Sequence, residues 1–237
     1  MKPVYVILIL GIALLIFIVL AIFIYRYAKK RGVDQLMQLF IKSAFEQKQR
    51  SFRSYNKNAE PNGIVFIGDS ITQDYNVYEY FPNRKVYNRG IGGDTSLGLL
   101  SRLDTSVFDL NPKTVVLLIG TNDFGLMQTT ADEVAARIKE IVTKIQQRLP
   151  KTRIILESVY PVNPTMDGFS VGQRNNQNIK ELNEILKTIP GVTYLDLYSL
   201  LIDETGNFNP KYTLEGLHAS PDGYEFITSI LNEYLDD

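Results

Sequence analysis

Five short, largely apolar runs recur along the chain from residue 64 onward, and they constrain its fold more than any other feature. The runs are rich in valine, isoleucine and leucine, and each has the length of a strand rather than of a helix. Strands that are apolar along their whole length are typical of a parallel sheet that is buried on both faces. The runs lie at 64–67, 85–88, 114–119, 153–159 and 192–197.

Stretches of helical length separate most of these runs. A last helix is expected after Ser220, which suits the N-cap position, with Pro221 in the first helical position and Asp222 near the positive end of the dipole. Strands that alternate with helices predict one three-layer α/β/α domain with a five-stranded parallel sheet. The separating stretches lie at 95–106, 130–149 and 173–188.

The composition excludes several classes of protein. The chain has 237 residues, of which 45% are hydrophobic, and this is enough for one substantial core. Its formal net charge is −1, so no basic surface points to a nucleic-acid partner. The absence of cysteine excludes disulfides, a thiol nucleophile and cysteine-based metal sites.

An uncharged segment of 22 residues, from Val4 to Tyr25, lies near the N-terminus. As a helix it would be about 33 Å long, which is roughly the thickness of the hydrocarbon core of a bilayer. A cleavable signal peptide would have a shorter apolar region, followed by a cleavage site with small residues. Here the basic sequence RYAKKRG follows. The segment therefore predicts a retained single-pass anchor in the cell membrane, over residues 1–31.

The charges on the two sides of this segment bear on its orientation. Lys2 and the terminal amine precede it, whereas two lysines and two arginines lie within residues 26–31. Cytoplasmic flanks carry an excess of positive charge, so the bias favours a cytoplasmic domain after the anchor. An extracytoplasmic domain stays open as the alternative.

A predicted linker joins the anchor to the α/β domain. Apolar residues recur there at helical spacing, which predicts an amphipathic helix over residues 32–57. The turn-rich sequence NAEPNG then begins the α/β domain, which is predicted to cover residues 58–237.

Small polar residues and glycines follow three of the predicted strands. Gly68, Asp69 and Ser70 follow the first strand, residues 88–96 contain NRGIGGDTS after the second, and residues 120–123 contain GTND after the third. The carboxyl ends of parallel strands meet at one edge of the sheet, where ligands bind in such folds. Taken singly, the serine, glycines and asparagine are ordinary capping and turn residues. Their coincidence at three strand ends indicates a site.

The only histidine of the chain, His218, lies three residues after Glu215. At this spacing in a loop, the carboxylate can reach one imidazole nitrogen and leave the other free to act as a base. The alternative is a surface histidine beside an unrelated glutamate.

The blocks GDSI, NRGIGGDTS, GTND and EGLHAS occur in this order, and the chain from about residue 64 to its end resembles the SGNH (GDSL) hydrolases, a family of esterases and lipases. The resemblance implies a flavodoxin-like α/β/α fold, with Ser70 as nucleophile and His218 as general base. It also implies an oxyanion hole made by the backbone N–H groups of Ser70 and Gly93 and by the side chain of Asn122. The family usually has aspartate three residues before the histidine, where this chain has Glu215, which would complete the triad.

The resemblance implies serine-dependent hydrolysis of carboxylic esters through an acyl-enzyme, without metal or cofactor. Short acyl or O-acetyl esters of small molecules or carbohydrates are the favoured substrates. Three alternatives stay open: an O-acyltransferase with the same triad, a non-catalytic binding module tethered to the membrane, and a Mg²⁺ site formed by Asp69, Asp94 and Asp123. The oligomeric state is left open.

Overall fold

The computed structural model describes residues 3–235. By their contacts the residues divide into two compact units, 1–44 and 45–237, and each is described by itself. Met1 and Lys2, which enter the charge argument for orientation, lie outside the described residues.

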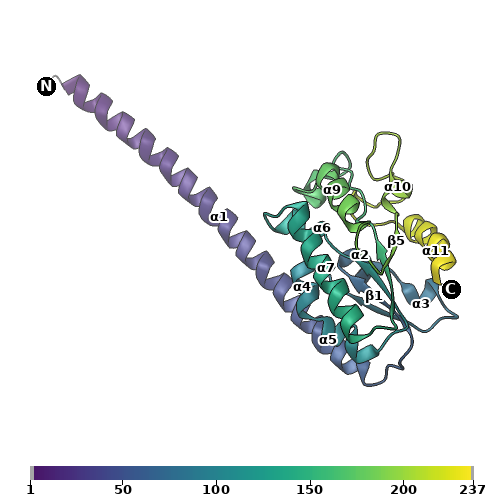
Figure 1. Cartoon of the computed structure of the whole chain (residues 1–237). Helices are drawn as coiled ribbons and strands as arrows, with labels where there is room; N and C mark the ends of the chain where they lie inside the picture. The colour runs from purple at the N-terminus through teal and green to yellow at the C-terminus, as the bar shows by residue number, and fades with distance from the viewer. Residues whose placement is uncertain (1–2, 236–237) are drawn as a thin grey trace. The chain divides into compact units, whose positions relative to one another are not determined.

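The first unit consists of most of a long helix, α1, which runs from Pro3 to Asn56 (Figure 1). Within it, Leu10–Val33 has a mean hydropathy of 2.4 and is long and apolar enough to cross a membrane. A signal sequence has the same properties of length and composition. The helix passes from the predicted anchor into the predicted linker without a break, so the limits of these two segments stay predictions.

The second unit contains five parallel strands in the order β2-β1-β3-β4-β5. This is the strand order of the flavodoxin-like folds, and it confirms the predicted three-layer α/β fold. The two central strands β1 and β3 are buried along their whole length, as their apolar sequences predict. The strands are β1 (Ile64–Gly68), β2 (Val86–Gly90), β3 (Thr114–Leu118), β4 (Arg153–Glu157) and β5 (Thr193–Leu195).

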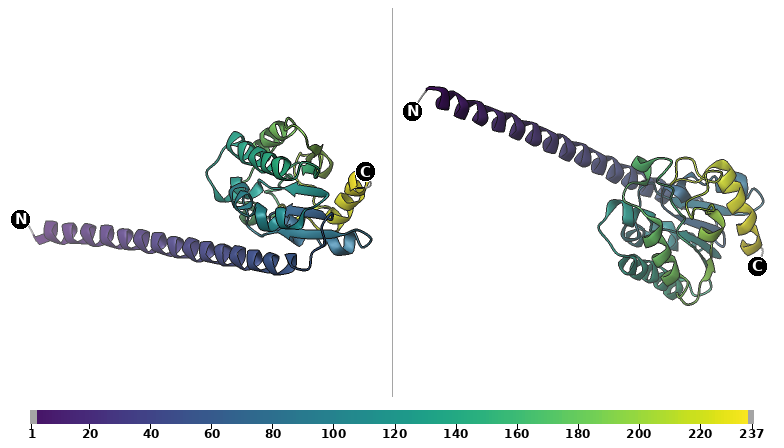
Figure 2. Two further views of the ribbon diagram at one scale, coloured as in Figure 1. Left: turned by 60° about the horizontal axis from the view of Figure 1, so that its bottom comes forward. Right: turned by 90° about the horizontal axis from the view of Figure 1, so that it is seen from above.

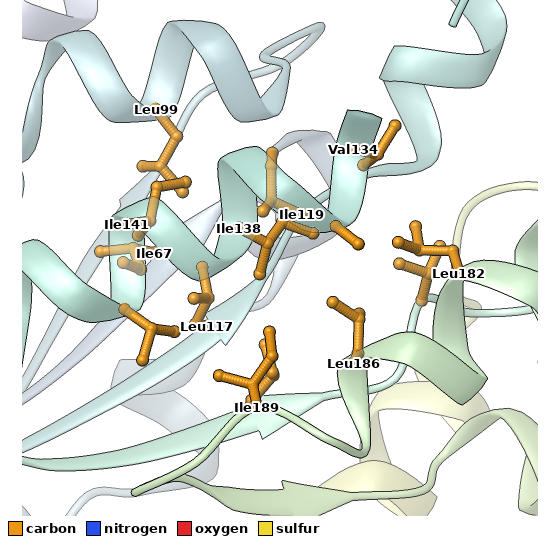
Figure 3. Close-up of a cluster of buried hydrophobic side chains, with 14 of the residues drawn as sticks. Ile67, Leu99, Leu117, Ile119, Val134, Ile138, Ile141, Leu182, Leu186 and Ile189 are labelled. Carbon is orange, nitrogen blue, oxygen red and sulfur yellow. The ribbon is translucent and has the colours of Figure 1, made fainter. Parts of the chain in front are cut away.

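Helices cover both faces of this sheet, and each face has its own apolar core. Val65 and Ile67 belong to the core on one face, with side chains of α4, α7 and α9. Figure 3 shows Ile67 in this core. Ile64 and Phe66 point to the other face and pack with α11, which Figure 2 shows in yellow, apart from the green helices. The helices of this unit are α2 (Ser70–Asp74), α3 (Val77–Tyr80), α4 (Ser96–Ser101), α5 (Leu103–Ser106), the 3₁₀ helix η1 (Phe108–Leu110), α6 (Thr121–Leu126), α7 (Ala131–Arg148), α8 (Gly168–Val171), α9 (Asn176–Leu186), α10 (Tyr198–Leu201) and α11 (Pro221–Leu235).

The prediction of one helix over 95–106 is wrong in one respect, because the helix is interrupted at Arg102. This residue has φ −119° and ψ 15°, outside the helical range, and it separates α4 from α5. Its guanidinium is fully buried and donates hydrogen bonds to the backbone of β1 and β2. We attribute the break to these hydrogen bonds.

The end of α1, from Phe45 to Asn56, contacts the edge strand β2 within the second unit. Phe52 is buried, and the guanidinium carbon of Arg89 lies 4.9 Å from the centroid of its ring. Asn56 accepts a hydrogen bond from Arg89 at 2.7 Å and donates one to the carbonyl of Thr105 at 2.7 Å. Much of the predicted linker thus belongs to the α/β unit by its contacts.

Candidate active site

Ser70 is the first residue of α2 and directly follows strand β1 and Asp69. Asp69, and not Ser70, caps this helix, because its carboxylate accepts a hydrogen bond from the backbone N–H of Ile71 at 3.0 Å. The hydroxyl of Ser70 is therefore available for another partner. That partner is Nε2 of His218, at 3.0 Å from the serine Oγ.

His218 lies in a short loop that the backbone fixes. Thr213 and Ala219 form an antiparallel bridge, and the carbonyl of His218 accepts hydrogen bonds from the N–H of Leu214 at 2.9 Å and from the hydroxyl of Thr213 at 2.8 Å. Gly216 has φ 98°, and a Cβ there would lie 2.2 Å from the carbonyl oxygen of Asn163. Only glycine fits this turn, which brings the histidine back over the sheet edge.

Glu215 contacts the imidazole of His218 through its Oε1 and the ring Nδ1. The same carboxylate oxygen accepts a hydrogen bond from the backbone N–H of His218 at 3.3 Å. Because an ionised carboxylate only accepts, the proton of a neutral imidazole resides on Nδ1, and the lone pair of Nε2 faces Ser70. The side chains of His218 and Glu215 are 30% and 25% exposed, so water reaches this half of the site.

The loop after β2 contains the second predicted donor, Gly93. The N–H of Asp94 donates to the carbonyl of Ile91 at 3.1 Å, which closes a turn around Gly93. Gly93 has φ 75°, a conformation that side chains with a Cβ rarely adopt. The turn follows β2, and Ser70 follows the neighbouring strand β1.

Asn122 is the third predicted donor and lies in α6, after strand β3. It is buried, and both ends of its side-chain amide have partners. The NH₂ group donates to the carbonyl of Asp94 at 3.0 Å, and the oxygen accepts a hydrogen bond from Arg174 at 2.6 Å. The first of these bonds joins the loop after β2 to the helix after β3.

A buried ion pair holds the loop after β2 against the sheet. Arg102 donates from Nε to Asp94 Oδ2 at 2.7 Å, and both side chains are almost fully buried. The same guanidinium donates to the carbonyl of Gly68, two residues before Ser70, at 2.9 Å. Arg102 thereby joins the loop of one predicted oxyanion donor to the strand that leads to Ser70, the predicted nucleophile.

Asp69 is a buried carboxyl group next to Ser70 in the chain. It is 1% exposed, and its Oδ2 has no hydrogen-bond partner within residues 3–235. Burial raises the pKa of Asp69 to about 7, although the hydrogen bond from the N–H of Ile71 works in the other direction.

The three aspartates that sequence reasoning gathered into a possible Mg²⁺ site have separate partners. Asp94 pairs with Arg102, and the fully buried Asp123 accepts hydrogen bonds from the N–H and hydroxyl of Ser96 at 2.8 and 2.5 Å and from Arg137 at 3.2 Å. Among the described residues, no group of three or more histidine, aspartate or glutamate side chains is placed to hold a metal. These contacts favour structural roles for Asp94 and Asp123 over metal coordination.

Sequence reasoning missed the two buried arginines of the site. Arg102 lies in a stretch of helical length, where an arginine usually faces water, so no local signal reveals its burial. Arg174 lies in a long polar segment before α9, and an arginine in such a segment usually faces water. The structure instead buries Arg174 against Asn122, while the neighbouring Asn175 caps α9.

Comparisons with known proteins show the family to which the chain belongs. Residues 66–226, which are more than half of the chain, match the GDSL-like Lipase/Acylhydrolase family. The chain therefore belongs to this family. Its membership of the family supports a hydrolase that acts on esters in general.

Individual relatives cover most of the second unit. The platelet-activating factor acetylhydrolase IB subunit alpha2 of Rattus norvegicus is 31% identical over 188 residues, which cover 76% of this chain and 78% of the relative. A structure from Streptococcus pneumonia, provisionally described as a platelet activating factor, is 32% identical and has a TM-score of 0.78, with 85% of this chain and 97% of the other covered. A GDSL-like lipase from Bacteroides thetaiotaomicron, 23% identical, shares the fold with a TM-score of 0.68 and coverage of 79% and 97%.

Proposed function

We propose that the protein hydrolyses carboxylic esters through a covalent acyl-enzyme formed on Ser70. The observation that carries this proposal is the distance of 3.0 Å between Ser70 Oγ and His218 Nε2, in a histidine whose other nitrogen contacts Glu215. A serine hydroxyl is a weak nucleophile at neutral pH and needs such a base.

In the first step, Nε2 of His218 takes the hydroxyl proton of Ser70 while Oγ attacks the ester carbonyl. Glu215 stabilises the resulting imidazolium and keeps its own charge. The imidazolium then returns the proton to the alcohol oxygen as the bond between carbonyl carbon and alcohol breaks. In the second step, His218 removes a proton from water as the water oxygen attacks the acyl carbon. The imidazolium then gives this proton to Oγ of Ser70 as the bond between Oγ and the acyl carbon breaks, which releases the acid.

The negative oxygen of each tetrahedral intermediate would be bound by the N–H groups of Ser70 and Gly93 and by the NH₂ group of Asn122. The first N–H groups of a helix have no partner within that helix, which suits Ser70 to this role at the start of α2. Donors placed in advance stabilise the transition state without a cost of reorganisation, and the loss of one such donor typically reduces turnover by about 10²–10³.

Short acyl esters, above all acetyl esters, are the proposed substrates, on a small molecule or a carbohydrate. The name of the relatives that are 31% identical, acetylhydrolase, supports acetyl as the acyl group. The apolar segment of α1 supports a membrane location for the enzyme, and the charges that flank it favour a cytoplasmic active site.

The test uses the full chain in detergent with p-nitrophenyl esters of increasing acyl length. We expect turnover to be greatest with acetate and to be lost in Ser70→Ala, while Ser229→Ala, an exposed serine on α11, retains wild-type turnover. A fluorophosphonate probe should add covalent mass at Ser70. A wild-type chain that neither turns over these esters nor reacts with the probe would refute the proposal in favour of a non-catalytic module.

An O-acyltransferase would use the same groups, with a sugar hydroxyl in the place of water. Adding an excess of carbohydrate acceptor to the acetate assay separates the two activities. Hydrolysis predicts free acetate as the main product, whereas transfer of most acetyl groups to the acceptor would establish the transferase.

A further inference from the structure

Arg174 is a buried cation at the edge of the candidate active site. It is 9% exposed and precedes helix α9. Its guanidinium donates to the carbonyls of Thr121 at 3.0 Å and Val171 at 3.0 Å, and to the side-chain oxygen of Asn122 at 2.6 Å. A fourth hydrogen bond, at 3.3 Å, goes to the carbonyl of Ser170. The arginine thus joins the helix that carries Asn122 to the loop after β4.

The partners of Asn122 determine which end of its amide faces which way. A guanidinium can only donate, so the group that faces Arg174 must be the amide oxygen. A carbonyl can only accept, so the group that faces the carbonyl of Asp94 must be the NH₂. Both partners require the same orientation. It leaves the second hydrogen of the NH₂ group available to a ligand.

The charge of Arg174 strengthens this orientation. Among residues 3–235, every hydrogen bond that Arg174 donates goes to an uncharged oxygen. Burial lowers the pKa of Arg174, but a guanidinium starts so high that it stays charged at neutral pH. Hydrogen bonds from a charged donor are stronger than those between neutral groups.

The surroundings also leave the guanidinium no room to move. A Cβ added to Gly125 would lie 2.3 Å from the guanidinium carbon of Arg174, so α6 packs directly against it. Side chains that hold an oxyanion donor must restrict it to one geometry for the donor to act without reorganisation.

We propose that Arg174 is a positioning residue that keeps the NH₂ group of Asn122 turned toward the reacting carbonyl. The proposal rests on the proposed esterase function, since it assigns Asn122 to the oxyanion hole. Among the described residues, the hydrogen bonds of Arg174 go to Thr121, Ser170, Val171 and Asn122, and none goes to Ser70. Its effect on catalysis passes through Asn122, and this separates it from a residue that only stabilises the fold.

The test is a double-mutant cycle between Arg174→Met and Asn122→Ala, with p-nitrophenyl acetate as substrate. Asn122→Ala should lower kcat by about 10²–10³. Arg174→Met should lower kcat by about 10–100-fold with KM within about 3-fold, because a hydrogen bond from a charged donor biases the amide by about that factor. In the Asn122→Ala background, Arg174→Met should change kcat less than about 3-fold, since the group that it positions is gone.

A matched control is Arg89→Met, a buried arginine that contacts Phe52 and Asn56 instead of Asn122. Any effect of Arg89→Met on kcat should be the same in the wild-type background and in the Asn122→Ala background. Wild-type kcat in a folded Arg174→Met variant, or losses from Arg174→Met and Asn122→Ala that multiply in full, would overturn the proposal. Thermal melting shows whether each variant folds.

Two milder variants keep the proposal testable if Arg174→Met does not fold. Arg174→Lys keeps the charge but cannot reach Thr121 and Asn122 with separate donors, so kcat should still fall. Gly125→Ala displaces the guanidinium and should lower kcat in the same direction. If the wild type reacts with the fluorophosphonate but turns over none of these esters, hydrolysis of these substrates fails by itself. The rate at which fluorophosphonate labels Ser70, compared between wild type and Arg174→Met, then tests the positioning role separately.

Discussion

The two halves of the candidate site are held in different ways. Asn122 and Asp94 are buried; Arg174 holds Asn122, and the ion pair of Asp94 with Arg102 holds the loop of Gly93. His218 and its partner Glu215 lie on a partly exposed loop, which is held by hydrogen bonds to its backbone. An oxyanion donor acts best when it does not move, whereas a base must exchange protons with the serine, the alcohol and water. Burial is therefore concentrated on the half that has to stay still.

The largest effect is expected from His218→Ala, which removes the proposed base from the partly exposed half of the site. Turnover should fall by about 10⁴–10⁶, because Ser70 then has no group to accept its proton. Steady-state kinetics with p-nitrophenyl acetate measure this loss. The melting temperature should change little because the side chain is partly exposed. A variant that keeps a tenth of the activity would show that another group acts as base.

Glu215 is expected to produce the next largest effect. Glu215→Gln should lower kcat by up to about 10⁴, because the amide can donate to Nδ1 and stabilise the wrong tautomer of His218. Glu215→Ala should lose less, since water can enter this partly exposed half and accept from Nδ1. Comparison of the two kcat values gives the answer. The reverse order would mean that the carboxylate acts mainly by holding the loop.

In the buried half, Arg102→Met should act mainly on stability. It leaves Asp94 without its partner in a buried position, which typically costs about 3–5 kcal/mol of the free energy of unfolding. Urea unfolding measures this loss, and Arg148→Met, which removes an exposed ion pair with Asp104, should cost about 1 kcal/mol or less. Equal losses from both variants would show that the Asp94 pair is not buried in solution.

The smallest effect concerns the pH dependence of stability. Burial raises the pKa values of Asp69 and Glu157 to about 7, so both carboxyls stay protonated in the folded chain at pH values where they ionise in the unfolded chain. The folded state then binds more protons than the unfolded state between about pH 4 and pH 7, and their contribution to stability falls as the pH rises through this range. Above about pH 7 this contribution becomes constant.

Asp69→Asn and Glu157→Gln should each make the melting temperature less dependent on pH between pH 4 and pH 7. Glu204→Gln, which changes an exposed carboxyl, is the matched control and should follow the wild type. Unchanged slopes in both buried variants would mean that these carboxyls titrate outside this range.

Much of the fold could be predicted because its signals are local. The apolar runs define the strands, and the structure confirms a five-stranded parallel sheet, although the predicted last strand at 192–197 shortens to β5, Thr193–Leu195. The helix predicted over 130–149 is found as α7, which begins after Thr130 with a capping box between Thr130 and Glu133. Periodicity and caps depend on residues within a few positions of each other, so they can be read from the sequence.

The candidate site was predictable only in part. Ser70 and Asn122 stand in short polar blocks after predicted strands, and the coincidence of these blocks indicates a site. The roles predicted for them and for His218 came from the resemblance to the SGNH hydrolases. The 3.0 Å contact between Ser70 and His218 joins residues 148 positions apart, and it required the structure.

The sequence by itself determined the order of strands and helices along the chain, the apolar segment near the N-terminus and the polar residues at three strand ends. Each of these features depends only on residues that are close together in the chain. Only the tertiary structure decided that Arg102 and Arg174 hold the site. Their hydrogen bonds reach Gly68 and Asn122 across 34 and 52 positions of the chain. An arginine acquires such a role only when packing excludes water and leaves carbonyl, carboxylate and amide oxygens as its partners.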